Sequence, residues 1–135
     1  MTTTTLLGLI TLGIMLLCLL MAAFALFVPT RNKLANRLMA AYLLILATTI
    51  SVFFYHQHVQ IPLWLDKIRD DISALSAPLF FLYILSLLYL DFKLRWKHLW
   101  HLLPFLVTIL VFLPNFYAVS EEGRGVFFLN YNDYW

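Results

Sequence analysis

The chain has 135 residues, of which 63% are hydrophobic and only 12% are charged, and its formal net charge is +2. Soluble domains carry about 25% charged residues, so a soluble fold of this composition would expose large apolar patches. The small positive charge does not indicate a nucleic-acid surface, and the single cysteine, Cys18, excludes an intrachain disulfide. We therefore expect one small domain within a membrane.

The first predicted element is a membrane helix over residues 5–28, which contains 14 Leu, Ile, Phe or Val residues. Pro29 ends it, because the residue before a proline is disfavoured in α geometry. A cleaved signal peptide is the alternative, and Ala22, Ala23 and Ala25 resemble a weak cleavage site. The absence of basic residues ahead of the run and its length favour an uncleaved helix.

Three further apolar stretches follow, over residues 34–55, 72–92 and 97–118, before a tail at 119–135. Their interiors carry no charged residue. Each stretch has close to the length that crosses a bilayer as a helix, which is about 20 residues. The long link 56–71 contains the charged cluster 66–71, and we expect it to lie as an amphipathic turn on the membrane surface. The predicted fold is an all-α polytopic bundle of four membrane helices.

The basic residues predict the orientation of these helices. Six of them lie at or beside the first link (30–33) and the third link (93–98): Arg31, Lys33, Arg37, Lys93, Arg95 and Lys97. Three lie on the opposite side, and these are Lys67, Arg69 and Arg124. The positive-inside rule then places the first and third links in the cytoplasm. Both termini are therefore expected outside.

The first helix carries a stripe of small or weakly polar residues within an arc of about 100°. The stripe consists of Gly8, Thr11, Cys18, Ala22 and Ala25. Small residues let membrane helices approach closely, so we predict a helix-packing face. A face inside this bundle is the favoured interpretation, and a homodimer interface is the alternative.

Polar side chains also form stripes on the other three helices, and they are expected to face inward, away from lipid. Those that together predict a shallow polar cavity are Thr48, Ser51, Tyr83, Ser86, His101, Thr108 and Asn115. Hydroxyl groups that bond to backbone carbonyls explain the stripes equally well, and this second interpretation is favoured. In the fourth helix, Pro104 and Pro114 each predict a kink.

Candidate metal ligands are limited to two histidine pairs, His56 with His58 and His98 with His101. Neither pair has a third ligand nearby, and zinc takes three or four, so no metal site is expected. No nucleotide-binding or catalytic motif is present, so no cofactor is expected. The charge-free interiors also lack the buried carboxylate that a proton-coupled transporter needs. Transport and catalysis are therefore disfavoured.

Three short motifs occur in a characteristic order. The segments 32–38 (NKLANRL), 76–83 (SAPLFFLY) and 98–105 (HLWHLLPF) follow one another across the second to fourth helices. This order resembles the N-terminal membrane region of bacterial AraC-type transcriptional regulators that are anchored in the inner membrane. The resemblance covers residues 32–105 and implies a multi-helix membrane domain ahead of cytoplasmic helix-turn-helix units.

The chain departs from that family because it carries no DNA-binding half, so it looks like a fragment or a free-standing relative. We expect a sensory or anchoring module of a transcriptional regulator in the bacterial inner membrane, acting through helix packing or oligomerisation. The alternative is a small accessory protein that packs against a larger membrane partner. Expected partners are the lipid bilayer and either a second copy or further membrane helices, with no direct nucleic-acid contact.

Overall fold

The computed structural model describes residues 3–58, 61–89, 91–120 and 123, although the side chains of 3–5, 56–58, 99 and 115 are not described. Helices are the only regular elements in these ranges. In chain order they are α1 (Thr3–Phe27), α2 (Lys33–Ile50), α3 (Val52–His58), α4 (Leu63–Ser73), α5 (Ser76–Leu88), the 3₁₀ helix η1 (Trp96–Leu102), α6 (Leu103–Phe112) and the π-helical turn η2 (Leu113–Tyr117).

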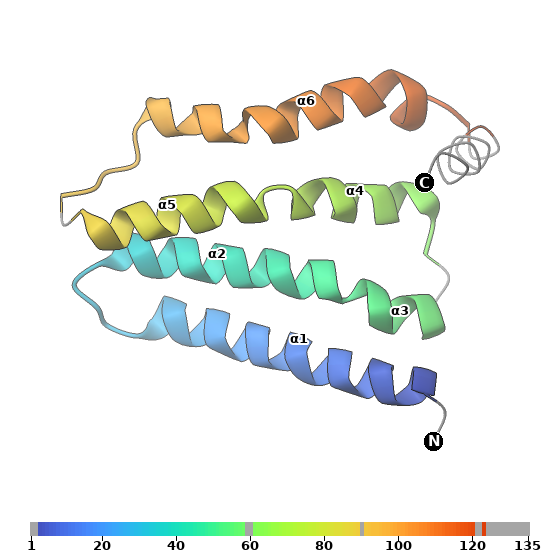
Figure 1. The fold of residues 1–135 in the computed structure, drawn as a ribbon, viewed down its shortest axis with the longest axis horizontal. Coiled ribbons are helices and arrows are strands. Elements are labelled where there is room, and N and C mark those ends of the chain that lie inside the picture. The colour runs from blue at the N-terminus through green and yellow to red at the C-terminus, as the bar shows by residue number, and fades with distance from the viewer. Residues whose placement is uncertain (1–2, 59–60, 90, 121–122, 124–135) are drawn as a thin grey trace.

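These helices form four antiparallel rods that lie side by side in chain order (Figure 1). The rods are α1, then α2 with α3, then α4 with α5, and last η1 with α6 and η2. In the described residues, α1 packs on α2 and α3, α2 packs on α4 and α5, and the fourth rod packs on α4 and α5. The molecule is thus a row of rods, with α1 and α6 at its two edges.

The predicted all-α fold is confirmed, and three segments are long and apolar enough to cross a membrane. They are Leu6–Phe27, Lys33–Tyr55 and Leu63–Leu88, and a shorter apolar helix spans Trp96–Phe112. The first two agree closely with the expected helices. The third differs, and that difference determines where the candidate site lies.

The third rod begins nine residues before the predicted start at residue 72 and ends before the predicted end at residue 92. The charged segment 66–71, expected to lie on the membrane surface, is helical and continues the line of α5 (Figure 1). Its charges are compatible with that position because they pair with each other within α4 and form hydrogen bonds with neighbouring rods. Pro78 lacks a backbone N–H, which accounts for the short break between α4 and α5.

Close contact between α1 and α2 depends on small side chains. Cys18 and Ala22 from α1 meet Ala40, Leu43 and Ala47 from α2 in one buried cluster. Ala22 and Ala40 are each only 1% exposed. With so little side-chain volume between them the two backbones approach closely, and this favours association in lipid, where no hydrophobic effect drives it.

Asn32 joins the link after α1 to the end of α5. Its side-chain oxygen accepts a hydrogen bond from the Ala35 N–H at 3.1 Å and so caps the N-terminus of α2. Its Nδ2 donates to the Ser86 backbone carbonyl at 2.7 Å. That carbonyl lies in the last turn of α5, where intrahelical partners run out. One side chain therefore satisfies two helix ends.

The prolines of the fourth rod act differently from one another. Pro104 lies in the first turn of α6, a position in which a helix tolerates the missing N–H. Pro114 lies in the π-helical turn η2, in which the Ala118 N–H donates to the Leu113 carbonyl at 3.0 Å. Pro104 thus coincides with the change from the 3₁₀ helix η1 to α6, and Pro114 with the π-helical turn η2.

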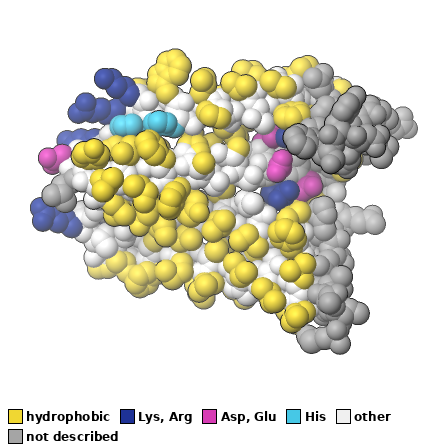
Figure 2. All heavy atoms as spheres, in the orientation of Figure 1, with side chains coloured by type: hydrophobic (Ala, Val, Ile, Leu, Met, Phe, Trp, Pro, Cys, Tyr) yellow, Lys and Arg dark blue, Asp and Glu magenta, His cyan; other side chains and the backbone are white. Residues whose placement is uncertain are grey.

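Charged side chains gather at opposite ends of the row (Figure 2). Lys and Arg side chains dominate the end where α2 begins and α5 ends. At the other end, acidic and basic side chains lie next to each other between α4 and α6. The first distribution leaves exposed positive charge, and the second brings opposite charges into contact.

Candidate functional site on the charged helix α4

Helix α4 carries ionisable side chains that are buried among the rods. Lys67 is 7% exposed and Asp71 is 4% exposed. The expectation that the chain has no buried carboxylate is therefore wrong. The prediction fails because residues 56–71 were expected on the membrane surface, whereas residues 63–73 form α4 and belong to the third rod. Unpaired ions at such positions would be expensive, so their partners define the site.

The spacing of the charges directs them to two faces of α4. At about 100° per residue, Asp66 and Arg69 share one side of the helix, and Lys67 and Asp71 share a side roughly opposite. The first pair faces α2 and α3, and the second faces α6 and η2. Each ion pair lies within α4, and each contacts a different rod through hydrogen bonds or an aromatic ring.

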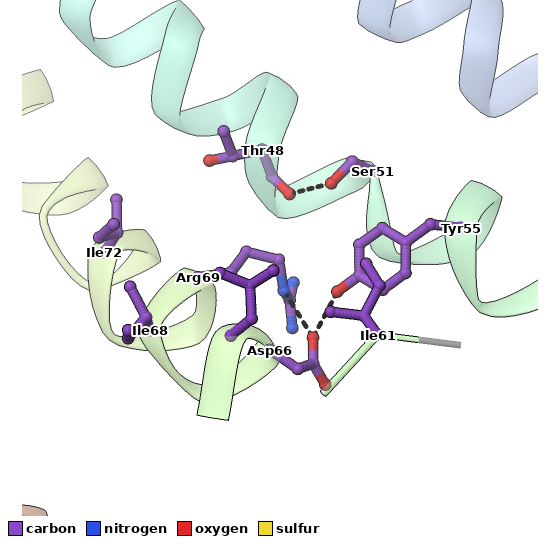
Figure 3. Close-up of a pocket in the computed structure, with 9 residues that line it drawn as sticks. Thr48, Ser51, Tyr55, Ile61, Asp66, Ile68, Arg69 and Ile72 are labelled. Carbon is purple, nitrogen blue, oxygen red and sulfur yellow. Dashed lines mark hydrogen bonds and ion pairs between the residues drawn. The ribbon is translucent and has the colours of Figure 1, made fainter. Parts of the chain in front are cut away.

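On the α2–α3 side, Asp66 accepts two hydrogen bonds through the same carboxylate oxygen (Figure 3). One comes from the Tyr55 hydroxyl of α3, and the other from Arg69 Nε at 2.9 Å. Arg69 Nη1 also donates to the Thr49 backbone carbonyl of α2 at 3.3 Å. The second and third rods are therefore joined by charge-assisted hydrogen bonds.

A cavity of about 320 Å³ lies beside this ion pair, between α2, α3 and α4. Its walls combine polar groups around the ion pair with four aliphatic side chains. The lining residues are Thr48, Ser51, Tyr55, Ile61, Leu65, Asp66, Ile68, Arg69 and Ile72 (Figure 3). An apolar cavity with a few convergent polar groups has the general composition of a small-molecule site.

On the α6 side, Lys67 and Asp71 form a buried salt bridge one helical turn apart. The Tyr117 hydroxyl donates to the second Asp71 oxygen at 2.5 Å. Lys67 Nζ also lies 4.0 Å from the centroid of the Phe112 ring, a cation–π contact.

The π-helical turn η2 brings Tyr117 to Asp71. Pro114 cannot donate a backbone hydrogen bond, and the helix widens at this point. A π turn adds one residue to the helical repeat, which rotates every later side chain by about 100° relative to a regular α-helix. Phe116, fully buried, and Tyr117 then face the rest of the molecule. Without the turn, Tyr117 would point elsewhere.

A second cavity of about 240 Å³ lies between α4 and the fourth rod. Its lining includes Asp71, Tyr117 and apolar residues of α6. Ile68 and Ile72 line both this cavity and the larger one on the other side of α4. These two isoleucines therefore form a ridge with free space on both flanks.

The predicted helix-packing face on α1 lies toward the α2 side of the row. Gly8, Thr11, Cys18 and Ala22 are buried, and Ala25 is half-buried. Cys18 and Ala22 belong to the cluster shared with α2, against which Ala25 also packs. The Thr11 hydroxyl donates to the Leu7 carbonyl of its own helix at 2.8 Å. The face thus contributes to packing within the chain.

The residues of the predicted polar cavity do not gather in one place. Thr48 and Ser51 line the larger cavity, but Tyr83 and Ser86 lie near the end of α5. Four hydroxyls bond to backbone carbonyls of their own helices: Thr48 to Ile45, Ser51 to Thr48, Ser86 to Tyr83 and Thr108 to Pro104. The Asn115 side chain is outside the described part. The favoured alternative, local bonding to carbonyls, accounts for these hydroxyls.

The two histidines of η1, His98 and His101, each contact a different neighbour. The His101 ring lies 4.8 Å from the Phe81 ring, centroid to centroid, and His98 lies 4.9 Å from Phe92. His98 Nδ1 also accepts a hydrogen bond from the Arg95 N–H at 2.9 Å. Within the described residues, no three His, Cys, Asp or Glu side chains are arranged to hold a metal ion. The side chains of His56 and His58 fall outside that description.

Tyr55 shares the predicted polar face of Thr48 and Ser51, and all three line the larger cavity. The site residues that sequence reasoning missed are Asp66, Lys67, Arg69, Asp71 and Tyr117. The chain does contain an indication of them. Asp66 and Arg69 are three residues apart, and Lys67 and Asp71 are four apart, which are the spacings of paired charges on a helix. Those spacings predict that residues 66–71 are helical, but they do not predict which rods the charges contact.

No family model matches the chain, and comparison with curated proteins and with solved structures gives no significant match.

Proposed function

We propose that the chain is a sensory or anchoring membrane module that acts through helix packing, with no chemistry of its own. The observation that carries this proposal is the attachment of the fourth rod. None of the ten residues of α6 is buried, although the structure describes all of them. Its polar connection to α4 is the cluster of Lys67, Asp71 and Tyr117. A helix without buried residues, attached to α4 through such a cluster, is suited to switch between two positions.

We propose four membrane spans in a bacterial inner membrane, with both termini outside. The charge distribution supports this arrangement, because the exposed Lys and Arg side chains gather at the end expected to face the cytoplasm (Figure 2). Lys67 and Arg69, which the orientation rule counts for the outside, are both paired with carboxylates. Reporter fusions after residues 31 and 95 are expected to be active only inside the cell, and outside activity would contradict the topology.

The depth of the buried ion pair in this arrangement supports a functional role. From Asp71 to Leu88 the helix rises about 26 Å at 1.5 Å per residue. This length is shorter than the thickness of a hydrocarbon core, which is about 30 Å. A membrane whose inner boundary lies near Leu88 therefore contains Asp71. Ionisable residues inside a membrane are costly, and they are kept mainly where function requires them.

The output of the module, in this proposal, is a transcriptional regulator of the AraC type. The order of the three motifs over residues 32–105 supports it. Reading the gene beyond the codon for Trp135 tests this part directly. The expected result is coding sequence in the same frame for further membrane helices, which return the chain to the cytoplasm, followed by a helix-turn-helix region. A stop codon at that point would contradict it.

A distance measurement tests the movement of the fourth rod. Spin labels at Leu44 of α2 and Leu106 of α6, both exposed, report the separation of the two rods in lipid, with Cys18 replaced by serine. We expect Asp71→Asn to shift or broaden this distance, and a label pair at Leu44 and Leu16 of α1 to stay unchanged. An unchanged distance between α2 and α6 would contradict the proposed mechanism.

One observation favours the accessory-protein alternative. The row of rods leaves α1 and α6 at open edges, and large apolar side chains such as Leu17, Leu20 and Leu110 are 60% or more exposed there. Further membrane helices of a larger protein would fit against either edge. Co-purification of one defined membrane protein with the chain, lost when α6 is made polar on its outer face, would support this function.

A further inference from the structure

The larger cavity beside the Asp66–Arg69 pair has the size and shape of a site for a small lipid-like molecule. Its volume is about 320 Å³, at the lower end of the roughly 300–1,000 Å³ of ligand pockets. At about 30 Å³ per small atom group, this is room for on the order of ten non-hydrogen atoms. Ile61, Leu65, Ile68 and Ile72 supply aliphatic walls.

The cavity opens through an apolar rim. Leu65 is 43% exposed and Ile72 is 36% exposed, and both line the cavity. Ile72 belongs to the third apolar segment, so this rim faces lipid in the proposed arrangement. A ligand that enters here comes from the bilayer and must itself partition into it.

The polar groups of the cavity determine which head group fits. Arg69 donates through Nε to Asp66 and through Nη1 to the Thr49 carbonyl. A guanidinium has five N–H donors in a rigid fork, so donors remain for a ligand. They lie beside the cavity, next to the Asp66 carboxylate (Figure 3).

The charge balance of the cavity favours a neutral head group. Asp66 and Arg69 compensate each other, so their net charge is zero. A carboxylate ligand would add an uncompensated negative charge close to Asp66 in a poorly hydrated site, which is unfavourable. A carbonyl oxygen of an ester, lactone or ketone accepts a hydrogen bond without adding charge.

We infer that this cavity binds a neutral, membrane-soluble molecule of about ten non-hydrogen atoms, with an aliphatic chain among the isoleucines and a carbonyl oxygen on Arg69. This inference rests on the proposed sensory function and names the ligand class of that module. Ile68 and Ile72 give a route for its effect, because they also line the cavity against the fourth rod. A ligand that displaces this ridge changes the space between α4 and α6.

Binding of methyl octanoate to the full chain in lipid nanodiscs tests the inference, with a ¹³C label in the ester carbonyl. We expect saturable binding and a lowered carbonyl stretching frequency, because the oxygen accepts a hydrogen bond from Arg69. Arg69→Gln should remove the frequency shift and weaken binding about tenfold, the usual effect of losing one hydrogen bond to a charged donor.

Two serine variants form a matched pair that does not disturb the ion pair. Ser51 lines the cavity, whereas Ser73 of α4 does not, and each hydroxyl donates at 2.6 Å to the carbonyl three residues earlier. Ser51→Leu should fill the cavity and weaken binding at least about tenfold, because the ligand chain then loses its space. Ser73→Leu should leave binding unchanged.

Three outcomes would overturn the inference. The first is non-saturable partition of the ester that is identical in all variants, and the second is equal weakening by Ser51→Leu and Ser73→Leu. The third is tighter binding of octanoate or nonane than of the ester, which contradicts the neutral carbonyl head group.

The distance between labels at Leu44 and Leu106 separates this inference from the proposed function. Ester binding without a change of that distance would support the site and contradict the sensory mechanism. A distance that responds to Asp71→Asn in a protein that does not bind the ester would support the mechanism and overturn the site.

Discussion

Along the contact between α1 and α2 the buried side chains are apolar and mostly small, whereas the contact between α4 and the fourth rod depends on buried charges and aromatic rings. Cys18, Ala22, Ala40 and Ala47 leave little between the first two backbones. Lys67 and Asp71 instead reach across to Phe112 and Tyr117. Both contacts hold neighbouring rods together, but they respond to different perturbations.

The difference lies in how each contact tolerates change. A small-residue contact depends on shape alone, so it is insensitive to protonation and sensitive to added volume. An ionic contact depends on complete pairing, because each ion left alone in a poorly hydrated site costs several kcal/mol in general. The first contact is therefore suited to a fixed pair of helices, and the second to a rod that is released when one partner changes.

The largest expected effect comes from removing Asp71. Asp71→Ala leaves Lys67 buried without its carboxylate and removes the acceptor for Tyr117, so we expect the free energy of unfolding to fall by about 3–5 kcal/mol. Denaturation in mixed micelles measures it. Asp70→Ala is the control, because Asp70 is exposed on the same helix. Equal effects of the two substitutions would show that the cluster does not hold the fourth rod.

Added volume should break the other contact. Ala22→Leu inserts three carbon atoms where Ala22 is 1% exposed, and we expect a loss of about 1–3 kcal/mol and a larger separation of α1 and α2. Ala23→Leu, at an exposed position one residue along, should change neither quantity. Spin labels at Leu16 and Leu44 measure the separation. If both leucine variants behave like the unmodified chain, the small-residue contact is not close-packed.

A smaller effect is expected from the hydroxyl that connects the fourth rod to Asp71. Tyr117→Phe removes one hydrogen bond to a charged acceptor, which corresponds to about 1.5 kcal/mol. The Lys67–Asp71 salt bridge remains, so the loss should be well below that of Asp71→Ala. Tyr89→Phe serves as the control because Tyr89 is 62% exposed. If the loss of stability were as large as that of Asp71→Ala, Tyr117 alone would attach the fourth rod to α4.

The smallest effect on stability is expected from Asn32, at the end of the row where the exposed basic residues gather. Asn32→Ala removes the cap of α2 and the bond to the Ser86 carbonyl, and we expect a loss of about 1 kcal/mol. Hydrogen exchange at the Ala35 amide should become faster, because that amide loses its acceptor. Asn36→Ala, one turn into α2, should leave this exchange rate unchanged.

Much of the architecture was predictable from local sequence. The apolar lengths predict helices over the first two rods, because each side chain there is compatible with lipid. The stripe of small residues on α1 was visible from its spacing alone. The start of the third rod could not be predicted in this way, because residues 66–71 are charged and charge by itself indicates exposure to water.

The candidate site was largely hidden for the same reason. Tyr55 and Tyr117 lie 11 and 46 residues from the carboxylates that they contact. No local pattern relates residues so far apart. The position of Tyr117 depends in addition on the π-helical turn at Pro114, where the sequence indicates a disturbed helix but not the direction in which the next side chains point.

The sequence by itself determined that the chain is all-α and has helices apolar enough for a membrane, because hydropathy and helix length are local properties. Only the tertiary structure decided which rods α4's charges contact and that the rods form a row. The charges pair within α4, but the tyrosine hydroxyl and the aromatic ring that complete the surroundings of Lys67 and Asp71 come from the fourth rod.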